Sequence, residues 1–179
     1  MNEKKINNIA DFAVKFPSEI SNKECLTVDN ISLSFNQFSI LVTSYAKKLK
    51  TLNLDKGDRV GILLFNSIEY LLLMYASMYA GFVPVNINAR YKAKELNYVL
   101  HDSKCKILFT SSQSDEVTNF SEIISSVYDS KEGRPEELID VYIIGGSKDN
   151  RFKNFKEFES ISVDNSFNEE AIGSENDPA

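Results

Sequence analysis

The chain has 179 residues, of which 42% are hydrophobic and 26% charged, with seven glycines and four prolines. These proportions are typical of an ordinary globular protein of one domain and exclude a fibrous or disordered chain. The net charge of −6 comes from the end of the chain: residues 1–154 hold equal numbers of acidic and basic residues and no cationic stripe, which excludes a nucleic-acid-binding surface.

The first predicted elements are a helix, a hairpin and a second helix. Residues 8–16 have a short amphipathic pattern that Pro17 closes. The β-rich runs CLTVD and ISLSF flank Asp29-Asn30, a good turn pair, and so predict a β-hairpin. Ser34, with Gln37 three residues later, predicts a capping box at the start of a helix. Its core face is predicted to comprise Phe35, Phe38, Leu41, Val42, Tyr45, Ala46 and Leu49.

From Arg59 onward, short apolar runs alternate with amphipathic segments. The runs are VGILLF, VPVNI, KILFTS and DVYIIGG, and helices are predicted near 67–80, 92–102 and 115–129. Asn66 is the predicted cap of the 67–80 helix, with Glu69 at its third position and Gly81 as its end. Four β runs separated by helices imply parallel pairing, so the predicted fold is α/β, a doubly wound and mostly parallel sheet preceded by the small hairpin.

The last part of the chain divides into a helix and a tail. Residues 152–161 predict one more helix, whereas residues 162–179 are acidic, rich in Asn and Ser, and without periodicity. We therefore expect a domain over 1–161 and an acidic linker over 162–179.

Several residue types that chemistry needs are missing from the places where this fold would use them. Ligands bind open α/β sheets at the carboxyl ends of the strands, and none of the four predicted ends carries a carboxylate pair, a His or a Cys. Phosphate cradles need glycines at a helix N-terminus, and neither of the glycine patterns that form them, GxxxxGK[ST] and GxGxxG, occurs. Cys25 and Cys105 belong to no metal-ligand spacing and are expected to be reduced.

The individual polar candidates each have a structural interpretation that is favoured over a functional one. Gly145-Gly146 is read as a turn that ends a strand, and His101 as a residue at a helix end. Arg90, which precedes Tyr91 after the NIN segment, could bind a phosphate or carboxylate bidentately, or could pair with a surface acid. The apolar stripe from Leu71 to Tyr79 could line an acyl pocket, but its spacing is first that of a core face.

A signal peptide and a transmembrane segment are not predicted. The N-terminal MNEKKINNIADF has no apolar run after its lysines, and the longest apolar stretch is interrupted by Glu69, Ser77 and Gly81. The cytoplasm is the expected compartment.

Three motifs give the segment from Ile31 to Ser112 a resemblance to the adenylate-forming superfamily. They are Phe35–Phe38, in the place of a Tyr-x-Glu-Leu helix, Gly57-Asp58-Arg59-Val60, and Ala80–Asn86, which reads AGFVPVN. The chain departs from the pattern at Phe38 and Ile40, within a scaffold helix. The continuation PVNINARYKAKEL is closer to fatty acyl-CoA synthetases than to peptide-synthetase adenylation domains.

The resemblance implies an activity and its cofactors. Enzymes similar to this chain use ATP and Mg²⁺ to convert a carboxylic, here fatty, acid to an acyl adenylate, and then transfer the acyl group to CoA. Their phosphate loop follows an Asp-Pro-Ala segment, and this sequence ends at Asp177-Pro178-Ala179. No catalytic, cofactor-binding or metal-binding residue carries over, so we expect the N-terminal part of such a ligase, inactive without the remainder of the enzyme.

Two other interpretations remain open at the level of sequence. The chain could be a noncatalytic α/β binding or interaction module built on the same scaffold, in which case an open apolar face would bind a partner. An unrelated nucleotide-binding domain would need a phosphate cradle that the sequence lacks.

Overall fold

The computed structural model describes residues 9–115 and 118–163, and these residues group in two compact units. The first unit comprises residues 9–57 and Asn66–Val83. The second comprises Asp58–Phe65 and Pro84–Ile161. The predicted linker lies almost wholly outside the described residues, so the boundary at 161 stays a prediction.

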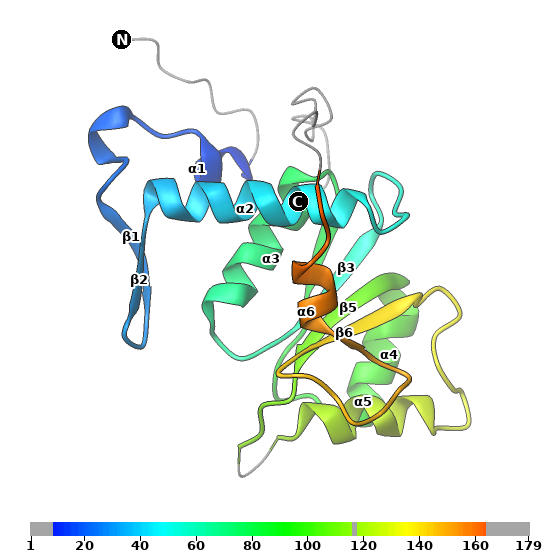
Figure 1. The fold of residues 1–179 in the computed structure, drawn as a ribbon. Helices are drawn as coiled ribbons and strands as arrows, with labels where there is room; N and C mark the ends of the chain where they lie inside the picture. The colour runs from blue at the N-terminus through cyan, green and yellow to red at the C-terminus, as the bar shows by residue number, and fades with distance from the viewer. Residues whose placement is uncertain (1–8, 116–117, 164–179) are drawn as a thin grey trace. The chain divides into compact units, whose positions relative to one another are not determined.

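The first unit contains the hairpin and the N-terminal helices (Figure 1). Its elements are α1 (Asp11–Val14), a 3-10 helix (Ser18–Ile20), β1 (Glu24–Val28), β2 (Ile31–Ser34), α2 (Phe35–Lys50) and α3 (Ile68–Tyr79). The hairpin is confirmed: β1 and β2 are antiparallel, and Asp29 in the turn has a φ of 53°. Helix α1 is shorter than predicted because Lys15 is already extended, two residues before Pro17.

Helix α2 begins with the capping box that the sequence predicted. The Ser34 hydroxyl accepts from the backbone N–H of Gln37 at 3.2 Å, and the Gln37 side chain accepts from the Ser34 N–H at 2.9 Å. These two bonds satisfy N–H groups that a helix start would otherwise leave unpaired. The buried face matches the predicted stripe at Phe38, Val42, Tyr45, Ala46 and Leu49.

The predicted cap of α3 was wrong by one residue. Ser67, with extended backbone, is the N-cap, and its hydroxyl accepts from the Tyr70 N–H at 3.1 Å. Asn66 and Ser67 are both good cap residues, and the path of the chain selects the second. The end was predicted correctly, since Gly81 has a φ of 85°.

The second unit is organised around a five-stranded sheet in the order β4-β3-β5-β6-β7. The strands are β3 (Arg59–Leu63), β4 (Val83–Asn86), β5 (Cys105–Ser111), β6 (Asp140–Ile144) and β7 (Lys153–Asn154). β3 pairs with β5, β5 with β6, and β6 with β7, all in parallel. The α/β prediction is confirmed, and the two-residue strand β7 was not predicted.

Helices cover both faces of this sheet. Helices α4 (Ala93–Ser103) and α5 (Phe120–Tyr128) share a buried cluster with Leu108, Val141 and Ile143. The alternate residues Phe109 and Tyr142 stack at 5.4 Å on the other face, where α6 (Phe155–Glu159) packs. Side chains alternate between the faces of a strand, so this division is what a doubly wound sheet requires.

Helices α5 and α6 both begin later than predicted. The side chain of Asn119 caps α5 by accepting from the Glu122 N–H at 3.2 Å, and the Asp115 N–H, at the predicted helix start, donates to the Thr118 carbonyl at 2.9 Å. Lys153 and Asn154 extend along β6 as β7, and Asn154 then caps α6. In both cases an Asn side chain marks the start of the helix.

Candidate functional site

The carboxyl-terminal edge of the sheet in the second unit is the place where this architecture binds ligands. β3 lies between β4 and β5, so the connection that follows β3 leads to one side of the sheet and the connection that follows β5 leads to the other. At such a switch point, the loops that follow the strands diverge and leave a crevice. Phe65 follows β3, Arg90 lies after β4, and Asp115 and Thr118 lie between β5 and α5.

Arg90 is held at this edge by contacts with all three segments. Its Nη1 donates to Asp115 Oδ2 at 2.8 Å and approaches Thr118 Oγ1 at 3.5 Å. Its guanidinium carbon lies 5.9 Å from the centroid of the Phe65 ring, and its backbone N–H donates to Asn88 Oδ1 at 2.9 Å. The pairing with a surface acid, which the sequence left as one of two interpretations, is therefore present.

Tyr91 and His101 have structural surroundings. Tyr91 packs against the core cluster beneath α4 and α5, and its backbone N–H donates to the Asn88 carbonyl at 3.0 Å. His101 is exposed on the last turn of α4. The contacts of the Arg90 guanidinium among the described residues are with Asp115, Thr118 and Phe65 instead.

The glycine pair after β6 forms the predicted strand-ending turn. Gly145 and Gly146 have φ values of 85° and 82°, and the Gly146 N–H donates to the Ile143 carbonyl at 3.1 Å. A Cβ at Gly145 would overlap the hydroxyl oxygen of Ser112 at the end of β5. Gly145 is thus required for two reasons: its backbone has a positive φ, and the end of the neighbouring strand approaches too closely to admit a Cβ.

Neither cysteine takes part in a disulfide among the described residues. Cys25 and Cys105 are both free. Burial raises the pKa of the Cys105 thiol, which lies 3.1 Å from the Ser103 hydroxyl. Nowhere in residues 9–115 and 118–163 do three His, Cys, Asp or Glu side chains gather in a way that could hold a metal ion.

The motif Asp58-Arg59 is structural in this unit. Arg59 donates from Nε to the Ser103 carbonyl at 2.8 Å and from Nη2 to the Lys104 carbonyl at 3.1 Å. These bonds supply donors to backbone carbonyls that the end of α4 would otherwise leave unpaired. Asp58 pairs with Lys106 Nζ at 2.8 Å at the start of β5. The pair therefore ties the beginning of β3 to the α4–β5 connection.

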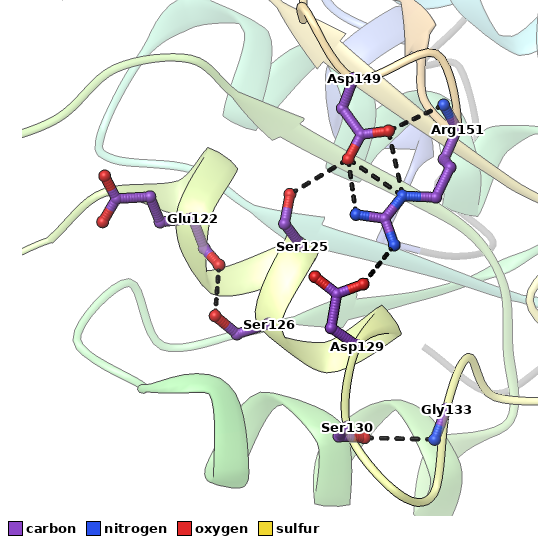
Figure 2. A network of polar contacts seen from close by, with 8 residues as sticks. All are labelled: Glu122, Ser125, Ser126, Asp129, Ser130, Gly133, Asp149 and Arg151. Carbon is purple, nitrogen blue, oxygen red and sulfur yellow. Dashed lines mark hydrogen bonds and ion pairs between the residues drawn. The ribbon is translucent and has the colours of Figure 1, made fainter.

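An ion-pair cluster after β6 was missed by sequence reasoning (Figure 2). The Arg151 guanidinium donates to Asp149 from Nε and Nη2 and to Asp129 from Nη1, at distances of 2.6 to 3.0 Å. These bonds hold the pKa of Asp149 down at about 2 and raise that of Arg151. The Asp-x-Arg spacing was the available signal, but Asp129 at the end of α5 could be found only in the structure.

Comparison with known proteins identifies the family. Residues 15–179 match the family model described as AMP-binding enzyme. The rat mitochondrial medium-chain acyl-CoA ligase ACSF2 is 38% identical over 96 residues, which cover 52% of this chain and 15% of that protein. The long-chain fatty-acid–CoA ligase FadD13 of Mycobacterium tuberculosis is 35% identical over 79 residues, 44% of this chain and 16% of that one.

Solved structures of ligases share the fold. The anthranilate CoA ligase AuaEII in complex with anthranoyl-AMP superposes with a TM-score of 0.71 at 23% identity, over 83% of this chain and 27% of that one. The N-terminal domain of FACL13 from M. tuberculosis superposes with a TM-score of 0.61 at 26% identity. That match covers 75% of this chain and 31% of the FACL13 chain. No helix among the described residues has both the length and the apolar character to cross a bilayer. By the match over residues 15–179, the chain belongs to the AMP-binding enzyme family.

Proposed function

We propose that this chain supplies the N-terminal part of an AMP-forming acyl-CoA ligase. Such a ligase converts a carboxylic acid, ATP and CoA to acyl-CoA, AMP and pyrophosphate by way of an acyl adenylate. The observation that carries the proposal is the family match over residues 15–179, together with curated relatives that are medium-chain and long-chain acyl-CoA ligases. The segments of the chain that match these relatives cover only 15% and 16% of the relatives' own length.

In this proposal the described residues are scaffold. At the sheet edge, Nη1 of Arg90 pairs with Asp115, and no residue there is assigned to catalysis. We place the groups that bind ATP, Mg²⁺ and CoA in the remainder of the enzyme, with residues 1–161 as the N-terminal subdomain and 162–179 as the linker. A fatty acid as substrate and the cytoplasm as compartment belong to the same proposal.

The test combines the chain alone with a chimera. The chain alone is incubated with Mg-ATP, CoA and octanoate or palmitate, and acyl-CoA and AMP are measured by mass spectrometry, with Mg-ATP binding measured by calorimetry. In the chimera, residues 15–179 replace the matching segment of FadD13, and circular dichroism verifies that the chimera is folded. We expect no turnover by the chain alone and ligase activity by the chimera.

Each arm can refute a different part of the proposal. Turnover or tight Mg-ATP binding by the chain alone would mean that the nucleotide site has been misplaced. A folded chimera that forms no acyl adenylate would show that this segment cannot serve as ligase scaffold. A stable complex of the chain with a partner protein, without turnover in either arm, would favour the noncatalytic module.

A further inference from the structure

Only one nitrogen of the Arg90 guanidinium, Nη1, makes side-chain hydrogen bonds among the described residues. Nη1 makes both side-chain hydrogen bonds, to Asp115 Oδ2 and Thr118 Oγ1, and the plane of the group is supported by the Phe65 ring. Phe65 is itself held by Phe120 at the start of α5, with ring centroids 4.7 Å apart. The guanidinium therefore loses little further freedom when it binds a ligand, which favours binding.

The remaining nitrogens of Arg90 are open. Among the described residues, Nε and Nη2 donate to no acceptor, and 59% of the side chain is exposed. Nε and Nη2 form the edge of a guanidinium that binds two oxygens of one carboxylate or phosphate through parallel N–H···O bonds.

Arg151 gives the comparison within the same unit. Its guanidinium also lies over aromatic rings, 5.5 Å from the centroid of Tyr128 and 5.6 Å from that of Phe152. However, all of its nitrogens already donate to Asp149 or Asp129, and 36% of its side chain is exposed. Two arginines in similar aromatic settings thus differ in whether the bidentate edge is occupied.

From this geometry we propose that Arg90 is an oxyanion-binding site, which takes a carboxylate or phosphate group across Nε and Nη2. The site lies at the carboxyl edge of the sheet, where β3, β4 and β5 end and where open α/β sheets bind ligands. Asp115 orients the guanidinium from the opposite side and neutralises part of its charge, so the affinity for a single oxyanion is modest. The proposal does not depend on the ligase function, since binding requires no turnover.

The experiment is an NMR titration of the whole 179-residue chain, labelled with ¹⁵N. The arginine Nε–H signals are followed at constant ionic strength as chloride is replaced by phosphate in one arm and by acetate in the other. We expect the Arg90 signal to shift and saturate, with half-saturation on the order of millimolar, while the Arg151 signal stays in place. The arm with the lower half-saturation concentration identifies the class of oxyanion.

Two variants test the assignment. Arg90→Lys, which keeps the charge and loses the planar fork, is expected to weaken binding about tenfold, and Asp115→Asn to tighten it severalfold by removing the competing charge. Because Lys has no Nε–H of this kind, binding to that variant is followed at the backbone amides of Asn88 to Tyr91. An Arg90 signal that does not saturate in either arm, or equal shifts at Arg90 and Arg151, would overturn the proposal.

Discussion

Replacing Gly145 by alanine tests whether the turn after β6 requires glycine for two separate reasons. The φ of 85° places an alanine in the left-handed region, which costs about 1–2 kcal/mol. The new Cβ would also overlap the Ser112 hydroxyl oxygen, which must leave its rotamer at a cost of about 0.5–1.5 kcal/mol. We expect Gly145→Ala to lower the free energy of unfolding by roughly 1.5–3.5 kcal/mol, the sum of the two effects.

Gly133 supplies the matched control. It also has a positive φ, of 68°, but a Cβ there would meet no atom within 4 Å. Gly133→Ala should therefore show the backbone cost alone, about 1–2 kcal/mol. Ser112→Ala in the Gly145→Ala background should recover about 1 kcal/mol, because the Ser112 Cβ is at an ordinary contact distance of 3.5 Å.

The assay is urea unfolding followed by circular dichroism at constant pH, applied to the three variants and the unsubstituted chain. Equal losses for Gly145→Ala and Gly133→Ala would refute the steric part of the reasoning. The steric part would also be refuted if Ser112→Ala restored no unfolding free energy in the Gly145→Ala background.

Three further predictions concern the cap of α3, the core and the effect of pH. Ser67→Ala should cost about 1 kcal/mol of unfolding free energy, whereas Asn66→Ala should cost close to none, and the reverse order would contradict the observed cap. Phe158 is fully buried, and its ring centroid lies 5.1 Å from that of Phe109. Phe158→Ala should therefore lower the free energy of unfolding by about 3–5 kcal/mol. A loss below about 1 kcal/mol in urea unfolding would mean that α6 does not pack on the sheet as observed. Because the folded-state pKa of Asp149 is about 2, below its usual 3.8, its contribution to stability is complete above pH 4 and is lost as the pH falls from about 4 to 2. Asp149→Asn should flatten the pH dependence of the urea midpoint in that window, and an unchanged slope would argue against the pairing with arginine.

The features that the sequence predicted correctly depend on residues close together in the chain. The capping box of Ser34 and Gln37 spans three residues, and the buried stripe of α2 follows from helical spacing alone. The apolar runs from 60 to 146 predicted four of the five strands, because strands covered on both faces are nearly continuous in hydrophobicity. The hairpin turn at Asp29-Asn30 was equally local.

Where the sequence offered two adjacent choices, packing decided. Asn66 and Ser67 can each cap a helix, and only the extended backbone at Ser67 shows which one does. Lys153-Asn154 has no strand pattern of its own, and it pairs because β6 offers a free edge at that register. Local propensities were too similar in these places to determine the outcome.

The candidate site is the part that depends most on the tertiary structure. Sequence reasoning identified Arg90 and its two possible roles, but not Asp115, 25 residues away, nor the Phe65 ring beneath the guanidinium. In the same way, Arg151 could not be assigned to Asp129 before the loop after β6 was placed against the end of α5. Periodicity and capping signals act over three or four residues, so the sequence alone determined the elements and the α/β class. Which polar side chains meet at the edge of the sheet depends on strand order and register, which bring distant segments together only in the folded chain.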